Sequence, residues 1–286
     1  MPPTNFLDEI REAYAHSATQ RSYNLLLCGQ SGTGKTRMVG KTAIPPVLFF
    51  SFDPGGTKNL KPEISAGRVV VDPTFEGDDS PDVYNKFVKR FDMMAKDNFF
   101  DRFGTVCVDS LSTLGVSMMN LILHRNIVAP LSEKNKAAVT AMAQRGIIQL
   151  SDYQAFWDMT RRLVARMTRL SSDVILTAHL QEDKDELTGG LRFLVAVPGQ
   201  GKYQLPNMFD EIWTAQTRTV GSKTTYRVLT VNDGSYTNRS RLPEGKLDKF
   251  EAPDIQAIFT KAGREFSPKP LLKPATFVAS SEEAVE

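Results

Sequence analysis

Residues 25–36 read Leu25-Leu26-Leu27-Cys28-Gly29-Gln30-Ser31-Gly32-Thr33-Gly34-Lys35-Thr36. An apolar strand candidate runs directly into the spacing Gly-x-x-x-x-Gly-Lys-Thr, and a segment able to form a helix follows from Thr36. Glycines let successive backbone N–H groups turn inward around a polyphosphate, and the helix adds the positive end of its dipole. The pattern therefore predicts a phosphate-binding loop. A glycine-rich turn at the end of a strand is the plainer alternative.

Two side chains of this loop have predicted roles of their own. We expect the Lys35 ammonium to reach the β- and γ-phosphates of a nucleotide, and the Thr36 hydroxyl to coordinate Mg²⁺. The predicted cofactors are therefore ATP and Mg²⁺. The residues expected to bind the nucleotide are Gly29, Gln30, Ser31, Gly32, Thr33, Gly34, Lys35 and Thr36.

Composition is typical of a soluble globular protein, with 286 residues, 41% of them hydrophobic and 24% charged. A net charge of +2 neither requires nor excludes a nucleic-acid partner. Cys28 and Cys107 each lie in an apolar strand candidate, which predicts buried thiols rather than a disulfide or a metal site. Apolar runs stay well below the ~18 residues of a membrane span, and the polar start does not resemble a signal peptide. We expect a cytoplasmic protein without membrane contact.

Apolar runs and turn residues divide the chain into a core over residues 23–262, an N-terminal segment 1–22 and a tail 263–286. The predicted strands cover residues 23–28, 47–52, 69–71, 105–109, 173–179, 191–197, 211–217 and 225–231. The predicted helices cover residues 5–15, 36–44, 81–97, most of 110–170 with a break near Ala129-Pro130, and 254–261. The charged segment 181–190 is expected to be a loop, and the Pro-, Ser- and Glu-rich tail is expected to be disordered. Alternating strands and helices predict an α/β fold with a mostly parallel sheet between helices, extended by late antiparallel strands.

Two aspartates follow apolar strands, where the carboxyl ends of parallel strands bind ligands. Asp109 ends the strand 105–109 and is expected to hold Mg²⁺; capping the next helix is the alternative. Asp53 follows the strand 47–52 and is expected to orient an attacking water, although the turn Asp-Pro-Gly-Gly explains the same residues. Asp72 is a second candidate for that role.

Histidine stands at the end of the strand 173–179. His179 is expected to hydrogen-bond the γ-phosphate and to respond to its loss, with Gln181 as a second candidate and a purely structural histidine as the alternative. His124 lies in a largely apolar helical stretch, which indicates a structural role.

Basic and aromatic residues later in the chain give a weaker signal for nucleic acid. Arg162, Arg166 and Arg169 share one predicted helix face, which could contact DNA phosphates or a neighbouring subunit but is more often solvated. Phe193 and Tyr203 could stack on bases or belong to a sheet. The segment after His179 begins with acidic residues, so we expect weak and salt-sensitive DNA binding.

The order of these motifs resembles that of the RecA-like ATPases, and more narrowly the phage-encoded recombination ATPases associated with single-strand annealing systems. The resemblance covers residues 23–262 and rests on Gly29–Thr36, Phe49–Gly56, Val106–Ser110, Leu176–Gln181 and Tyr226–Leu242. It implies a RecA-type three-layer αβα P-loop NTPase fold.

The resemblance also implies roles for individual residues. Asp53 falls where the family has its general base, which is usually Glu, and His179 falls where it has a γ-phosphate sensor. Residues 181–200 match a DNA-contacting loop. Arg239 and Arg241 match a basic pair that reaches the nucleotide of a neighbouring subunit, although Lys is common at one position. Without the family, these two arginines are surface charges after a turn.

The function predicted from these features is DNA-stimulated, Mg²⁺-dependent ATP hydrolysis on single-stranded DNA in phage recombination or repair. The implied partners are a single-strand-binding or annealing protein and further copies of the chain, in the host-cell cytoplasm. A DNA-packaging or helicase-type motor, a small-molecule kinase and a nucleotide-binding regulator without turnover are the alternatives. From the short tail after the predicted core we expect no nuclease domain of the kind that packaging enzymes carry, and only the arginines of residues 161–169 could imitate a kinase lid.

Overall fold

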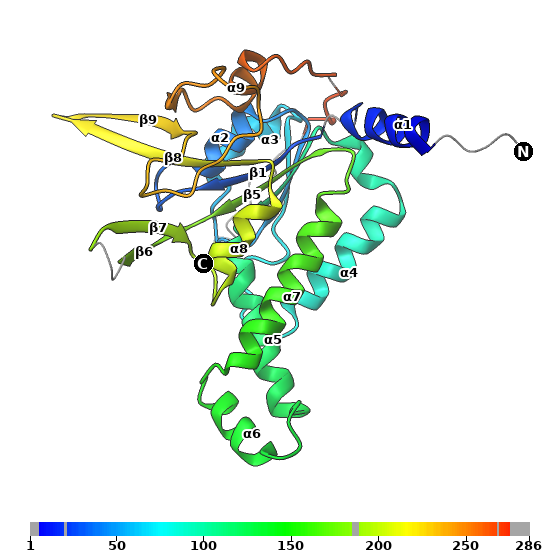
Figure 1. Cartoon of the computed structure of the whole chain (residues 1–286), viewed down its shortest axis with the longest axis vertical. Helices are drawn as coiled ribbons and strands as arrows, with labels where there is room; N and C mark the ends of the chain where they lie inside the picture. Colours follow the sequence, from blue (N-terminus) through cyan, green and yellow to red (C-terminus); the bar gives the residue numbers. More distant parts are fainter. Residues whose placement is uncertain (1–5, 20–21, 185–188, 268, 275–286) are drawn as a thin grey trace, which may run out of the picture.

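The computed structural model describes residues 6–19, 22–184, 189–267 and 269–274 (Figure 1). Its centre is an eight-stranded sheet in the order β10-β9-β8-β1-β5-β4-β2-β3. The strands of this sheet are β1 (Asn24–Cys28), β2 (Val47–Ser51), β3 (Val69–Asp72), β4 (Thr105–Asp109), β5 (Asp173–Ala178), β8 (Glu211–Val220), β9 (Lys223–Leu229) and β10 (Phe250–Glu251). The six strands from β8 to β3 run parallel, whereas β9 and β10 are antiparallel. The predicted α/β fold is confirmed, although residues 191–195 join a separate sheet and β8 still pairs in parallel with β1, so the antiparallel extension consists of β9 and β10.

Helices cover both faces of the sheet, giving three layers (Figure 1). One face carries α2 (Lys35–Thr42), α3 (Lys61–Ser65) and α9 (Ile255–Lys261), and the other carries α4 (Val83–Lys96), α5 (Leu111–Val128) and α7 (Leu150–Met167). The reason lies in the strand period of two: Leu25 and Phe49 face one core, whereas Leu26 and Phe50 face the other. Because both faces are buried, these strands are apolar throughout, as the sequence indicated.

A second, two-stranded sheet stands apart from the main one. β6 (Leu180–Lys184) pairs antiparallel with β7 (Leu191–Val195). The prediction of a loop over residues 181–190 is therefore wrong for 181–184, while residues 185–188 lie outside the described part. The side chains of β6 are mostly polar, so this segment gave no strand signal, whereas β7 lies within the predicted strand 191–197.

The helices α5 and α7 continue past the sheet and end in a helical protrusion (Figure 1). Its far end is α6 (Lys136–Gln144), and α5 stops at Val128, which confirms the predicted break before Pro130. A buried hydrogen bond of 2.8 Å from Asn126 Nδ2 to Asp152 Oδ1 joins the end of α5 to the start of α7. The remaining helical segments are α1 (Phe6–Thr19), α8 (Gly201–Gln204), and the 3₁₀ turns Lys58–Leu60, Phe99–Arg102 and Leu205–Met208. No helix of the described residues is long and apolar enough to span a bilayer.

The chain after α9 packs on the core over the described residues, so disorder from Gly263 onward is wrong for that part. Arg264 makes two hydrogen bonds with the buried Asp173, of 2.6 and 2.8 Å. The Leu272 N–H donates to Gly67 O at 3.0 Å. An ion pair and a backbone hydrogen bond therefore hold this segment against the core, although its composition predicted a disordered tail. Residues 275–286 lie outside the described part.

Candidate nucleotide-binding site

The phosphate loop lies between β1 and α2, and two of its positions require glycine for different geometric reasons. Gly34 precedes α2 with φ of 85°, a backbone conformation that glycine adopts without strain. A Cβ on Gly29 would lie 2.7 Å from Ala215 O of β8, so only glycine fits at this point. The loop therefore turns sharply beside the neighbouring strand and delivers the chain to the start of a helix.

The Lys35 side chain lies inside this loop. Its ammonium donates to Gly29 O at 2.8 Å and to Gln30 O at 3.1 Å, and the residue is 6% exposed. Burial lowers the pKa of Lys35, and the negative charge of Asp109 acts in the opposite direction. The loop thus holds a cation at its centre, which suits the binding of a polyphosphate.

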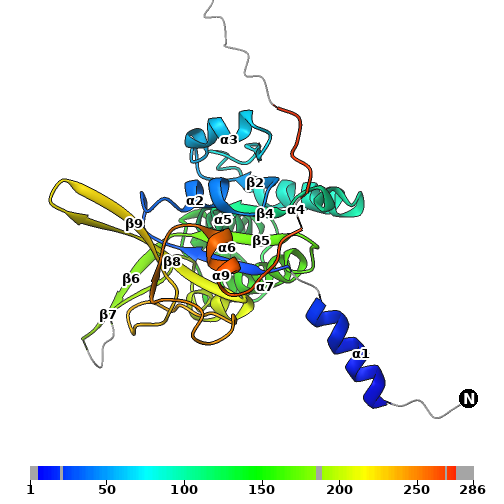
Figure 2. The ribbon, with the colours of Figure 1, turned by 90° about the horizontal axis from the view of Figure 1, so that it is seen from above.

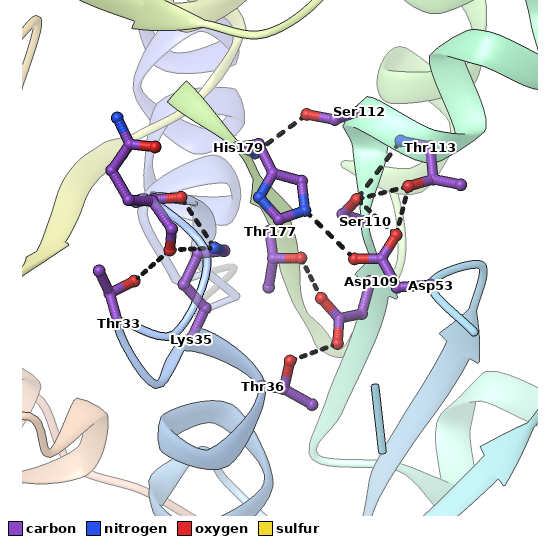
Figure 3. Close-up of polar contacts among 12 residues, drawn as sticks. Thr33, Lys35, Thr36, Asp53, Asp109, Ser110, Ser112, Thr113, Thr177 and His179 are labelled. Atoms are coloured by element: carbon purple, nitrogen blue, oxygen red, sulfur yellow. Dashed lines mark hydrogen bonds and ion pairs between the residues drawn. The ribbon is translucent and has the colours of Figure 1, made fainter. Parts of the chain in front are cut away.

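Thr36 and Asp109 meet at the same edge of the sheet (Figure 3). The Thr36 hydroxyl donates to Asp109 Oδ2 at 2.7 Å, and the Thr177 hydroxyl donates to Asp109 Oδ1. Asp109 is 2% exposed; burial raises its pKa, and the hydrogen bonds from Thr177 and Thr36 oppose that rise. Adjacent hydroxyl and carboxylate oxygens are the donor set that Mg²⁺ takes from proteins, so these residues fit the predicted cation.

The alternative role for Asp109, as the cap of the next helix, is wrong. Ser110 is the N-cap of α5, and its Oγ accepts a hydrogen bond of 3.3 Å from the Thr113 N–H. The Asp109 carboxylate therefore remains directed at the phosphate loop rather than at its own helix.

Asp53 is held by three side chains (Figure 3). Its Oδ1 accepts hydrogen bonds from Ser110 Oγ at 3.0 Å and from the Thr113 hydroxyl, and its Oδ2 lies 3.4 Å from His179 Nε2. Burial alone would raise the pKa of Asp53, but the hydrogen bonds from His179, Thr113 and Ser110 outweigh it and lower the pKa. Asp53 is consequently an ionised and oriented carboxylate.

Asp72, the second candidate for that role, has a different environment. Its carboxylate accepts hydrogen bonds from Arg90 Nε at 2.5 Å and from the Thr74 N–H at 3.2 Å. These partners come from α4 and from the turn after β3, and Asp72 is 6% exposed. These contacts form an ion pair between the end of β3 and α4, which indicates a structural role for Asp72.

His179 follows β5 directly and links two elements of the site. Its backbone N–H donates to Ser112 Oγ at 2.9 Å, while its ring contacts Asp53. The sequence alone did not identify the hydroxyl groups of Ser110, Ser112, Thr113 and Thr177. Their signal was a cluster of small hydroxyl residues directly after Asp109 and a threonine two residues before His179.

The two arginines after the β8–β9 hairpin lie beside the start of β8. Arg239 forms a backbone bridge with Ile212, and its guanidinium donates to the carbonyls of Pro206, at 3.2 Å, and of Phe209. Arg241 is 55% exposed and pairs with Asp210 at 2.7 Å. Ile212 pairs with Leu26 of β1, three residues before Gly29, and the side-chain hydrogen bonds of both arginines go to residues 206–210 rather than to the phosphate loop.

The arginines of α7 form ion pairs with neighbouring aspartates. Arg161 and Arg162 lie 3.5 and 3.6 Å from Asp158, and Arg166 pairs with Asp92. Arg169 lies in the turn after the helix end at Met167, so the predicted helical face is one residue shorter than its pattern indicated.

Two surface grooves lie outside the phosphate loop. One, of about 520 Å³, lies beside β6 and is lined in part by Gln181, Lys202 and Tyr203. Both Lys202 Nζ, at 3.0 Å, and the Tyr203 hydroxyl, at 3.2 Å, bond to Asp183. The ring of Phe193, the other predicted stacking residue, already stacks on the ring of Tyr236, with 4.7 Å between the ring centroids. The second groove, of about 460 Å³, lies beside α4 and contains none of the predicted site residues.

Comparison with known proteins identifies the family to which these motifs belong. The model of AAA_24, described as an AAA domain, matches residues 21–242. No curated protein matches the chain. Among solved structures, the KaiC-like protein PH0186 from the hyperthermophilic archaeon Pyrococcus horikoshii OT3 is similar at 11% identity and a TM-score of 0.37, over 72% of this chain and 77% of that chain. The flagellar accessory protein FlaH from Methanocaldococcus jannaschii is similar at 14% identity and a TM-score of 0.38, over 72% and 76%. At these scores the two structures add no argument to the topology itself.

Proposed function

Because this chain belongs to the AAA domain family, we propose that it is a Mg²⁺-dependent ATPase that acts on single-stranded DNA in phage recombination or repair. The observation that supports hydrolysis best is the meeting of four groups at one edge of the sheet. The loop cation Lys35, the pair Thr36–Asp109 and the oriented carboxylate Asp53 all lie there. Such a set can bind a triphosphate and also deprotonate a water.

The chain's own residues have distinct parts in the proposed reaction. Backbone N–H groups of the loop and the Lys35 ammonium bind the phosphate oxygens, while Thr36 and Asp109 hold Mg²⁺. The bound cation supplies positive charge that offsets the charge of the phosphates. A water attacks the γ-phosphorus and gives its proton to Asp53 as the bond to the β–γ bridging oxygen breaks, yielding ADP and phosphate. Ser110 and Thr113 fix the Asp53 carboxylate in place for this step.

We propose His179 as the residue that relates hydrolysis to DNA binding. Its ring contacts Asp53, and the strand β6 begins at the next residue, Leu180. A rearrangement of the His179 ring on loss of the γ-phosphate would therefore be passed to the β6–β7 hairpin and the groove beside it. The groove, with its exposed Tyr203 ring, is the surface we assign to single-stranded DNA.

Arg241 is the better candidate of the two arginines for a role in a neighbouring subunit. It is more than half exposed, whereas the Arg239 guanidinium bonds to carbonyls of its own chain. A homo-oligomer with sites between subunits, joined by a single-strand-binding or annealing protein as partner, completes the proposal.

Phosphate release measured with and without single-stranded DNA tests this function. Lys35→Ala is expected to lower turnover by at least about 100-fold with the fold retained, because it removes the cation from the loop. Lys41→Ala is the matched control, since Lys41 lies in the last turn of the same helix, is 42% exposed and pairs with Glu63 at 3.6 Å. Unchanged turnover in Lys35→Ala contradicts the site. Release that DNA does not stimulate contradicts the role on DNA.

A further inference from the structure

Two exposed apolar surfaces have no part in the proposed reaction. The first is the α1 stripe, which consists of Phe6, Leu7 and Ile10. Phe6 is 73% and Ile10 65% exposed. These residues lie one turn apart on the helix and so share a face, which is the pattern of a helix that packs against a partner. The stripe is therefore an apolar face that its own chain leaves in solvent.

The second surface is the protrusion tip, at the far end of α5 and α7 (Figure 1). It consists of Val128, Leu131, Met142, Ile147 and Leu150. Leu131 and Leu150 are 79% and 87% exposed, among the most exposed large apolar side chains described. The ends of α5 and α7 are joined by the buried Asn126–Asp152 hydrogen bond, so these residues are presented on a fixed support. Apolar side chains gathered in this way mark a site of protein contact.

We propose that α1 of one copy of this chain docks its stripe on the protrusion tip of a second copy. Charge favours this occupant over an unrelated apolar partner. The stripe is flanked by three carboxylates, of Asp8, Glu9 and Glu12, against one arginine, Arg11. The tip segment 129–150 carries three cations, Lys134, Lys136 and Arg145, against Glu133. Apolar faces rimmed by opposite charges form a complementary pair.

The stripe and the tip lie apart in the structure. Residues 20–22 join α1 to Tyr23 through a link of no more than about 14 Å, and α1 itself is 14 residues, or about 21 Å, long with the stripe at its start. The helix α5 starts at the carboxyl edge of the sheet and is 18 residues, or about 27 Å, long, and the tip lies beyond it. Figure 1 shows α1 at the upper right of the molecule and α6 at its lower end, and in Figure 2 α1 lies to one side of α6. Because the two surfaces lie apart within one chain, a contact between them joins two copies.

Since the stripe and the tip are different surfaces, their contact is heterologous and joins copies head to tail. This inference gives the proposed homo-oligomer a specific interface. It also connects that interface to the site, because the N-cap of α5 is Ser110, whose hydroxyl donates a hydrogen bond to Asp53, and the other end of α5 lies at the tip. The helix α5 would thus link the contact between copies to the residues that orient the Asp53 carboxylate.

Cross-linking between copies tests the contact directly. Cys28 and Cys107 are both buried, and burial raises the pKa of Cys28 to about 12, so introduced cysteines react alone. A chain with Ile10→Cys is mixed with a chain with Met142→Cys and treated with a short bismaleimide, with and without ATP and single-stranded DNA. We expect a mixed dimer that exceeds the product of the control pair, Thr219→Cys with Met142→Cys, because Thr219 lies near the exposed turn of the β8–β9 hairpin.

No excess of the Ile10–Met142 product in any condition overturns the proposal. A dominant product between two Met142→Cys chains also overturns it, since the tip would then pair with itself. Phosphate release is read separately, so loss of the cross-link and loss of hydrolysis are distinguishable.

Sedimentation gives a second, independent measurement. Ile10→Glu is expected to weaken self-association by about tenfold or more, because it places a charge in the apolar contact. Glu9→Lys should also weaken it, and adding Lys136→Glu in the same chain should restore it, since the two charges are exchanged across the interface. Thr224→Glu on β9 is the control and should behave as the wild type. Wild-type association that Ile10→Glu leaves unchanged, or a wild type that stays monomeric in every condition, contradicts the contact.

Discussion

The carboxyl edge of the sheet and the groove beside β6 hold their functional side chains in different ways. At the edge, Asp109 and Thr177 are 2% and 0% exposed, and each is bonded to the other. At the groove, Tyr203 is 45% exposed and Lys202 has Asp183 as its ion-pair partner. The edge is thus built from buried groups whose positions follow from strand register, whereas the groove is built from side chains that water can reach.

This difference has an energetic consequence. Removing one partner from a buried hydrogen bond leaves the other unsatisfied and costs about 1–3 kcal/mol, more where a charge is involved. An exposed ion pair contributes about 0–1 kcal/mol, because water and salt compensate for it. Substitutions at the edge should therefore act strongly and on one step, and substitutions near the groove should act weakly and on DNA affinity alone.

The largest effect is expected from Asp53→Asn, which keeps the shape of the side chain and removes its basicity. Turnover should fall by about 100-fold or more, because the water loses its proton acceptor, while nucleotide binding is retained. Steady-state phosphate release together with binding of a fluorescent nucleotide measures both quantities.

Asp72→Asn is the matched control for this prediction. Its carboxylate pairs with Arg90 and takes no part in the proposed site, so the melting temperature should fall while turnover stays within about twofold. The opposite result, with turnover lost in Asp72→Asn and kept in Asp53→Asn, would reassign the base to Asp72.

An intermediate effect is expected from Thr177→Val, which keeps the volume of the side chain and removes the hydrogen bond to Asp109. The Mg²⁺ concentration for half-maximal turnover should rise by about 10-fold or more, because a group that orients a metal ligand has been lost. Thr160→Val, which removes a buried hydroxyl on α7 far from the site, is the control and should leave the Mg²⁺ dependence unchanged. Equal Mg²⁺ dependence in the two variants contradicts the role of Thr177.

Most of this edge could be predicted from the sequence because its signals are local. An apolar run followed by a polar residue identifies both a buried strand and the point where it ends, so Asp53, Asp109 and His179 were found without knowledge of strand order. Parallel strands end at a common edge, which then brings these residues together.

The contacts within the edge could not be predicted in the same way. The Thr177 hydroxyl reaches Asp109 because β4 and β5 pair with Val108 beside Leu176, and register is a property of the tertiary fold. Similarly, β6 is a strand only through its pairing with β7, and Arg264 is ordered only through the buried Asp173. In each case a partner distant in sequence decides the local structure.

The smallest effects are expected at the groove and at the arginines of α7, and they separate a binding surface from a solvated one. Tyr203→Ala should weaken binding of a labelled single-stranded oligonucleotide by about tenfold, because it removes a ring on which a base can stack. Tyr203→Phe keeps the ring and loses only the hydrogen bond to Asp183, so its affinity should stay within about twofold of the wild type. Arg162→Ala should also change affinity by less than about twofold, since Arg162 is 72% exposed and already faces Asp158. Fluorescence anisotropy could show the reverse, with oligonucleotide affinity reduced in Arg162→Ala and unchanged in Tyr203→Ala. In that case DNA lies along α7 rather than in the groove, and the proposed path from His179 through β6 no longer leads to the bound strand.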